Sequence, residues 1–366
     1  MHFVPYALVA TSFYWNTAPL SSADAPTLAS GGTQSSFGAT TRQSRFGLRM
    51  RAPAVARAIA ADEVAAVGEV DFFGGYYASN DTTYFMPHVR LRLLLLSATY
   101  GPISIVVGQD TMVLAPLNPF SMTHVAVAGF QSAGNAWARI PQVRVDLRVR
   151  GLLLQAAVLA PAGAGQVEAS ASGLVVGRAP GRADRSGSPS LQARAAYALR
   201  LTDDRAITAG ASVHYGRDES MVEEGSTAPP ATVTSYAAAF DLDAPVLEWL
   251  ALRAEGYVGQ DLDGFFVDAD VVGDEPVPVI GGWCQLSVRI PPLAFHFGGG
   301  IEDPRAPEGS ALPTGAITNA RAIYAALGAT FGPLTLGVEL TSVWTGRAAM
   351  GSARGEQVAF ALLTQL

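Results

Sequence analysis

Residues 144–150 alternate strictly between charged and aliphatic side chains, and this alternation constrains the fold more than any other feature. The segment reads Arg-Val-Asp-Leu-Arg-Val-Arg, with every even position charged and every odd position aliphatic. On a helix these charges would be spread around the axis, whereas on a strand they all lie on one face. Similar alternation occurs at residues 45–51, 88–93, 191–201, 240–243, 252–258 and 284–290. The chain is therefore rich in strands that have one polar and one apolar face.

The connections between the predicted strands alternate between short turns and long loops. Strands are predicted at residues 2–15, 36–52, 64–78, 88–100, 103–116, 139–150, 152–164, 190–202, 205–217, 234–244, 250–263, 279–290, 293–302, 317–331, 334–346 and 353–366. A soluble sandwich with Greek-key connections has no reason to keep this parity, whereas an up-and-down membrane barrel does. We therefore predict an all-β protein with a single domain, residues 1–366. It forms a transmembrane antiparallel up-and-down β-barrel of about 16 strands, with long extracellular loops and short periplasmic turns.

The composition agrees with a barrel and excludes other classes. Hydrophobic residues make up 49% of the chain and charged residues only 15%, against ~25% charged in an average soluble domain. No apolar run approaches the ~20 residues of a spanning helix. The net charge of −7 argues against a nucleic-acid partner. No secretory signal precedes the first predicted strand, so we expect that any export leader lies outside this sequence. The single cysteine, Cys284, forms no disulfide within the chain.

An ordered series of short motifs in residues 4–150 resembles the DcaP-like porins and related sixteen-stranded bacterial porins. The motifs are Val-Pro-Tyr-Ala at 4–7, TRQSRFGLR at 41–49, GEVDFFG at 68–74, PHVRLR at 87–92, GQD at 108–110, PLNP at 116–119 and GNAWARIPQVR at 134–144. The resemblance implies a barrel in the bacterial outer membrane, commonly a homotrimer, whose third outside loop folds inward to narrow the pore. Some relatives favour anionic carboxylate solutes.

The third long loop of this chain, residues 117–138, is the candidate constriction loop. A loop that folds into a lumen needs turn residues and apolar anchors, and this loop has both. An ordinary surface loop is the alternative interpretation. The candidate constriction residues are Pro119, Phe120, His124, Asn135 and Trp137.

Arginines are concentrated on the strands that flank this loop. All 24 basic residues of the chain are arginine, which a GC-rich genome also explains. Arginine rings in narrow pores favour anions, including carboxylates and phosphates. Structural pairing with lumen acids and a cation preference are the alternatives. The candidate pore-lining residues are Arg45, Arg49, Arg90, Arg92, Arg139, Arg144, Arg148, Asp110 and Asp146.

The predicted function is passive, weakly selective diffusion of small polar or anionic solutes, with membrane lipid as the other partner. No catalytic, metal or cofactor site is predicted. The alternative is a barrel enzyme such as a phospholipase, although no Gly-x-Ser-x-Gly motif occurs. Its basis is that many serines coexist with His88, His124, His214 and His296. An acidic run could also hold Ca²⁺ through oxygen ligands, although such runs are more often only solvated. Its members are Asp263, Asp268, Asp270 and Asp274.

Overall fold

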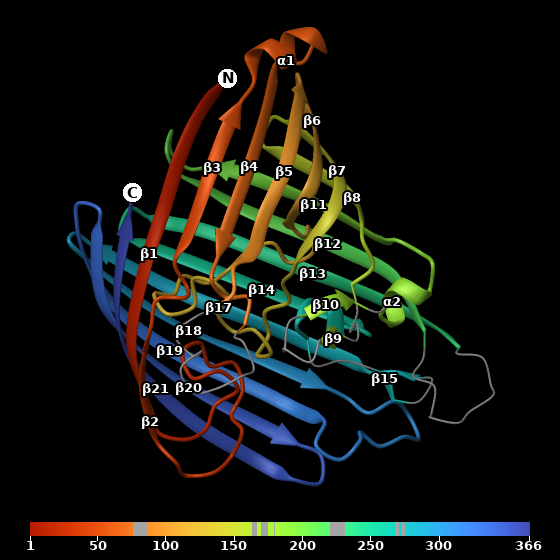
Figure 1. The fold of residues 1–366 in the computed structure, drawn as a ribbon, viewed down its shortest axis with the longest axis vertical. Coiled ribbons are helices and arrows are strands. Elements are labelled where there is room, and N and C mark those ends of the chain that lie inside the picture. The colour runs from red at the N-terminus through yellow and green to blue at the C-terminus, as the bar shows by residue number, and fades with distance from the viewer. Residues whose placement is uncertain are drawn as a thin grey trace.

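The computed structural model is a closed antiparallel barrel (Figure 1). The structure describes residues 1–75, 87–162, 167–169, 175–178, 180–219, 231–267, 271–272 and 275–366. The wall consists of β1 (His2–Asn16), β2 (Ser36–Thr40), β3 (Arg45–Arg51), β4 (Glu63–Asp71), β5 (Arg90–Tyr100), β6 (Ile103–Thr111), β7 (Arg139–Val149), β8 (Leu152–Leu159), β11 (Ser190–Arg200), β12 (Ala206–Glu219), β13 (Thr232–Leu247), β14 (Leu250–Gln260), β17 (Pro278–Ile290), β18 (Leu293–Pro304), β19 (Ile317–Phe331), β20 (Leu334–Arg347) and β21 (Gly351–Gln365).

Apart from β2 and β3, which both pair with β1, each wall strand pairs with the next in the chain, and β21 pairs with β1 to close the barrel. Strands β2 and β3 both pair with β1 and share one position, so the predicted number of sixteen is confirmed. The remaining described elements lie outside the wall. They are α1 (Pro53–Ala58), β9 (Val167–Ala169), β10 (Val175–Arg178), α2 (Arg182–Arg185), the 3₁₀ helix η2 (Asp263–Phe265), β15 (Val271–Val272) and β16 (Glu275–Pro276). None of the helices described is long and apolar enough to cross a membrane.

The alternation seen in the sequence separates two faces of the wall. Leu94, Phe240 and Phe297 point outward and are more than half exposed, whereas Asp146 and Asp241 point inward and are buried. An apolar outer surface of this extent needs apolar surroundings, which lipid provides. The buried charges of the wall therefore face the lumen.

Two predicted strands are longer than the observed ones, because their last residues leave the wall. The strand predicted at 103–116 ends at Thr111, and the one predicted at 250–263 ends at Gln260. The apolar residues that follow, such as Met112 and Leu262, are buried in the lumen instead. A short apolar run has the same pattern in a strand and in a buried loop. The strands predicted at 64–78 and 152–164 end at Asp71 and Leu159, and their last predicted residues lie outside the described residues.

The predicted strand 36–52 is interrupted at residues 41–44, opposite Ala10 of β1. There the Ser44 hydroxyl replaces the backbone groups that would otherwise pair with Ala10. It accepts a hydrogen bond from the Ala10 N–H at 3.0 Å and donates one to the Ala10 carbonyl at 3.2 Å. The break keeps the backbone groups of β1 paired and turns the intervening residue Gln43 into the barrel, where it is buried.

Candidate functional site

The segment between β6 and β7, residues 112–138, lies inside the barrel; we call it the inner loop. Leu114, Ala126 and Ala133 have no exposed surface. Among the predicted constriction residues, Asn135 and Trp137 are buried, as is Pro119. Phe120 and His124 retain exposed surface toward the lumen. The inner loop thus fills part of the cross-section that an open barrel would leave to water.

Polar side chains that project inward from successive strands bind the backbone of the inner loop. Oε1 of Gln192 on β11 accepts hydrogen bonds from the N–H groups of Val113 and Leu114, each at 3.0 Å. Farther round the wall, Glu255 on β14 accepts the N–H of Leu117 at 2.5 Å. A non-helical, non-strand backbone needs such partners when it is buried.

The series continues on the strands that follow β14 around the wall. Gln285 on β17 accepts the N–H of Phe120 and donates to its carbonyl, both at 2.9 Å. Glu339 on β20 accepts the N–H of Met122 at 3.0 Å and the hydroxyl of Thr123 at 2.6 Å. These side chains lie in the order in which the loop passes their strands, so the loop follows the inner circumference of the barrel.

The middle of the inner loop reaches the wall at β2–β5. Gln43, in the break between β2 and β3, accepts the N–H groups of Val125 and Ala126 at 2.9 and 3.2 Å. Arg90 and Arg92 donate to the Ala126 carbonyl at 2.6 and 3.1 Å. Because the inner loop is attached around the wall, it is a fixed narrowing element.

Two further segments, which the sequence analysis did not predict, also enter the lumen. The indole of Trp137 stacks on Phe266, with ring centroids 4.9 Å apart, and the backbone N–H of Trp137 donates to the Phe265 carbonyl at 3.1 Å. From the other side, Nε2 of His124 donates to the carbonyl of Pro26 at 3.1 Å. The segments 17–35 and 261–267 therefore pack against the inner loop inside the barrel.

A glycine on β18 allows the inner loop to lie directly against the wall. A Cβ at Gly300 would meet the Ala133 carbonyl oxygen, whereas a Cβ at the outward-facing Gly299 would lie 3.4 Å from its nearest atoms. We expect Gly300→Ala to displace the loop, to change the single-channel conductance and to cost roughly 1–3 kcal/mol of stability through overpacking. The matched Gly299→Ala protein should retain both properties. Urea unfolding in vesicles and bilayer recording measure the two effects, and equal results for both variants would contradict this contact.

Most of the predicted pore-lining arginines form ion pairs with lumen acids. Arg90 contacts Asp71 at 2.6 Å, and Arg92 contacts Glu69 at 2.6 Å and Asp71 at 2.9 Å. Arg45 lies 3.7 Å from Glu69. Arg92 is buried beneath the inner loop, so its charge is largely balanced by the two carboxylates.

The predicted residues of β6 and β7 form a second paired group. Arg144 lies between Asp110 and Asp146, at 2.9 Å from each. Arg148 is farther from Asp146, at 3.6 Å, and is more than half exposed. This group is consistent with a structural role for its charges.

Two other predicted arginines lie against aromatic rings. The guanidinium carbon of Arg139 is 5.0 Å from the ring centroid of Trp137, and that of Arg49 is 4.7 Å from the ring centroid of Tyr6. Such contacts retain the positive charge and orient the side chain.

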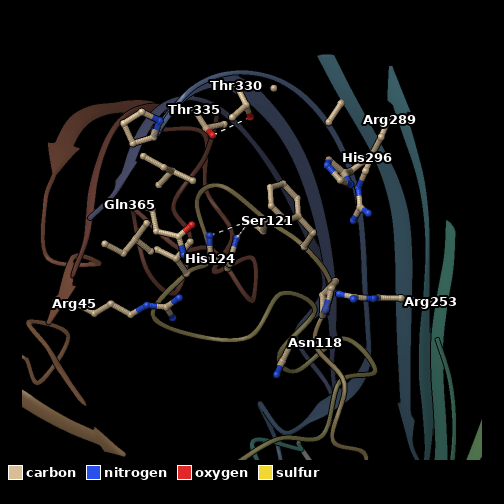
Figure 2. Close-up of a pocket in the computed structure, with 18 of the residues that line it drawn as sticks. Arg45, Asn118, Ser121, His124, Arg253, Arg289, His296, Thr330, Thr335 and Gln365 are labelled. Carbon is tan, nitrogen blue, oxygen red and sulfur yellow. Dashed lines mark hydrogen bonds between the residues drawn. The ribbon is translucent and has the colours of Figure 1, made fainter. Parts of the chain in front are cut away.

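Between the inner loop and the short-turn rim lies a cavity of about 590 Å³, which we call the vestibule. Arg45 and Arg253 extend into it from opposite walls, and Arg289 enters from the rim (Figure 2). His124 and His296 also line it, and among the described residues that line it there is no aspartate or glutamate. The partners of Arg45 and Arg253, Glu69 and Asp243, lie outside this lining. The vestibule is therefore electropositive.

The residues that build this site were only partly predicted. The sequence predicted Arg45 and the residues of the inner loop. It did not predict the wall residues that bind this loop or two of the vestibule arginines. The available signal was a long polar side chain at an inward position of nearly every strand, far from any turn. The unpredicted residues are Gln43, Gln192, Ser212, Glu255, Gln285, Tyr324 and Glu339, with Arg253 and Arg289.

One of the acids considered for Ca²⁺, Asp263, lies beside two carboxylates that contact a cation of the chain itself. Oxygens of Asp218, Asp261 and Asp263 lie within 4.8 Å of one another. Nη2 of Arg182 is 2.9 Å from Asp261 and 3.5 Å from Asp218, which reduces the attraction for a metal ion. The other acids of that hypothesis, Asp268, Asp270 and Asp274, lie outside the described residues.

One serine, histidine and glutamate do come together, but not as a catalytic triad. In a triad the two ring nitrogens contact serine and carboxylate separately. Here the Ser121 hydroxyl donates directly to Glu339 at 2.8 Å, and Nδ1 of His124 faces both, at 3.4 and 3.7 Å. Nε2 is engaged by a backbone carbonyl. The contacts fix the inner loop to the wall.

No protein-family model matches the sequence, and a search of curated proteins finds no match. Among solved structures, the outer membrane channel DcaP of Acinetobacter baumannii is similar over 100% of this chain and 97% of its own, at 16% identity and a TM-score of 0.76. OmpF of Salmonella typhi is similar over 100% and 97%, at 10% identity and a TM-score of 0.62. The trimer form of OmpT of Vibrio cholerae is similar over 100% and 99%, at 10% identity and a TM-score of 0.55. The chain therefore has the sixteen-stranded barrel fold of these outer-membrane proteins.

Proposed function

We propose that this protein is a porin of the bacterial outer membrane that gives passive, weakly selective diffusion to small polar and anionic solutes. The observation that carries the proposal is the vestibule of about 590 Å³, which is lined, as far as the described residues go, by three arginines and by no carboxylate. A barrel with a narrowing loop suits diffusion, and fixed positive charge near the narrowing favours anions.

The arrangement of the arginines suits passage rather than tight binding. Arg45 and Arg253 lie on opposite walls, and each is also held by a carboxylate outside the vestibule. A passing carboxylate exchanges part of its hydration for forked guanidinium contacts. Because these guanidiniums are already partly neutralised, the contacts are weak and the solute is released readily.

Reversal potentials in planar bilayers under a KCl gradient test the proposal. We expect discrete conductance steps and a reversal potential on the anion-selective side. A protein that inserts but does not conduct would contradict the porin function. Conductance with cation selectivity would contradict only the role of the vestibule arginines. A serine-directed probe that labels one serine of a non-conducting protein would instead support the phospholipase alternative.

We also propose that the protein assembles as a homotrimer surrounded by outer-membrane lipid. The support is the fold, which it shares with a protein solved in a trimer form, and the apolar outer wall. Native mass spectrometry from detergent should give three times the mass of one chain. A single-chain mass across mild detergents would contradict the trimer.

A further inference from the structure

The lipid-facing wall is hollowed over β17–β20 by a groove of about 1100 Å³. Its apolar part is formed by residues of the outer face, and its polar part lies toward the long-loop end of the strands. The apolar lining includes Gly282, Cys284, Gly299, Ile301 and Ile323; the polar lining includes Asp303, Asn319, Arg321 and Ser352.

The floor of the groove consists of glycines at outward-facing positions. Gly282 and Gly299 lie on neighbouring strands, and the larger side chains of Ile301 and Ile323 stand beside them as cross-strand partners. The neighbouring Gly300 is required by the inner loop, but Gly299 is not, because a Cβ there would keep 3.4 Å from its nearest neighbours. Packing inside the barrel therefore does not explain why residue 299, in the floor of the groove, is a glycine.

Arg321 carries the charge at the polar end of the groove. It lies on the outer face of β19, is exposed and is directly opposite Trp344 of β20. The nearby Asp303 forms an ion pair with Arg305 at 3.2 Å, and Arg354 forms one with Glu356 at 2.6 Å. Among the described residues, no carboxylate lies within ion-pair distance of Arg321. A guanidinium at the edge of the lipid-facing wall thus lacks an anionic partner within the described part of the chain.

We propose that this groove binds a membrane lipid whose phosphate contacts Arg321 and whose acyl chain lies over Gly282 and Gly299. The polar lining suits the headgroup of a phospholipid, and the apolar lining beyond it suits the acyl chain. Guanidinium binds phosphate oxygens in a forked geometry, and Trp344 at the same level is typical of the interfacial region of membrane barrels. The proposal depends on the membrane barrel and is independent of the solute that the pore conducts.

Native mass spectrometry of the purified barrel tests the proposal, with phosphatidylglycerol as the anionic probe and phosphatidylcholine of the same chains as the zwitterionic one. We expect the wild-type protein to retain more phosphatidylglycerol. Arg321→Gln should lower its retention about fivefold, as for one interfacial arginine, and leave phosphatidylcholine retention unchanged. Gly299→Leu, which fills the groove, should lower the retention of both lipids. The matched controls are Arg200→Gln, near the opposite rim, and Ala209→Leu, on the outer face of β12.

Retention of both lipids at the wild-type level by Arg321→Gln and Gly299→Leu would overturn the proposal. So would a change in the number of subunits in Gly299→Leu, because the groove would then be a contact between copies. If Gly299→Leu fails to fold, Arg321→Gln decides alone. Loss of phosphatidylglycerol from Arg321→Gln and not from Arg200→Gln supports a specific site.

Discussion

Replacing Glu339 with leucine is expected to detach the inner loop from β20, to raise the single-channel conductance and to lower the free energy of unfolding by about 3–5 kcal/mol. The Glu339 carboxylate is buried and accepts hydrogen bonds from two hydroxyls and one backbone N–H, those of Ser121, Thr123 and Met122. Leucine accepts none of them. Each buried donor left without a partner costs about 1–3 kcal/mol, so the loop relieves the cost by leaving the wall and the lumen widens.

Urea unfolding in lipid vesicles and single-channel recording measure the two effects on the same preparation. Glu63→Leu is the matched control, because Glu63 is half exposed and pairs with the exposed Arg51 at 3.0 Å. A surface pair of this kind contributes ~0–1 kcal/mol, and the control should keep its conductance. A Glu339→Leu protein that is destabilised but conducts as the wild type would show that this part of the inner loop does not limit conduction.

The wall could be predicted from the sequence because its signal is local. In residues 144–150 each side chain faces lipid or water according to its parity alone, and parity can be read without knowing any partner strand. The break at residues 41–44 could not be predicted in this way. It depends on the Ser44 hydroxyl facing Ala10 of β1, a contact that exists only after β1 and β3 have paired.

The path of the inner loop could not be predicted, because its partners meet only when the barrel closes. Gln192 and Glu339 are far apart in the sequence, yet both bind one loop that crosses between them. Their alternation with apolar neighbours indicated a lumen position but not a partner. The same holds for residues 261–267, whose apolar side chains resemble the end of a strand and instead pack on Trp137.

The balance of charge in the lumen also depends on register. The alternation of side chains along β5 places Arg90 and Arg92 inside the barrel. Only the pairing of β4 with β5 brings Asp71 and Glu69 against them. Of the three arginines that line the vestibule, two, Arg253 and Arg289, come from the second half of the chain. A one-residue change in register would have moved every one of these side chains to the other face.

Neutralising Arg289 is expected to lower the local concentration of a passing anion roughly sixfold and to raise that of a cation by the same factor, so the ratio of anion to cation permeability falls roughly 36-fold. A unit charge ~8 Å from a passing ion, at an effective dielectric constant of about 40, contributes ~1 kcal/mol, which corresponds to roughly a sixfold change in the ion's local concentration. Arg289 lines the vestibule. Arg45 and Arg253 are less suitable for this test, because their removal also exposes the carboxylates of Glu69 and Asp243.

Reversal potentials of Arg289→Gln and Arg289→Glu in a KCl gradient measure the effect. The glutamate variant changes the charge by two units, so its shift in free energy should be twice that of the glutamine variant and should take the channel toward cation selectivity. Raising the salt concentration should reduce both shifts, because screening shortens the reach of the charge. Arg305→Gln is the control, since Arg305 is exposed and paired with Asp303 at 3.2 Å outside the vestibule. Unchanged selectivity in both Arg289 variants would mean that permeating ions bypass the vestibule, and the arginine-based preference would then be wrong even if the barrel conducts.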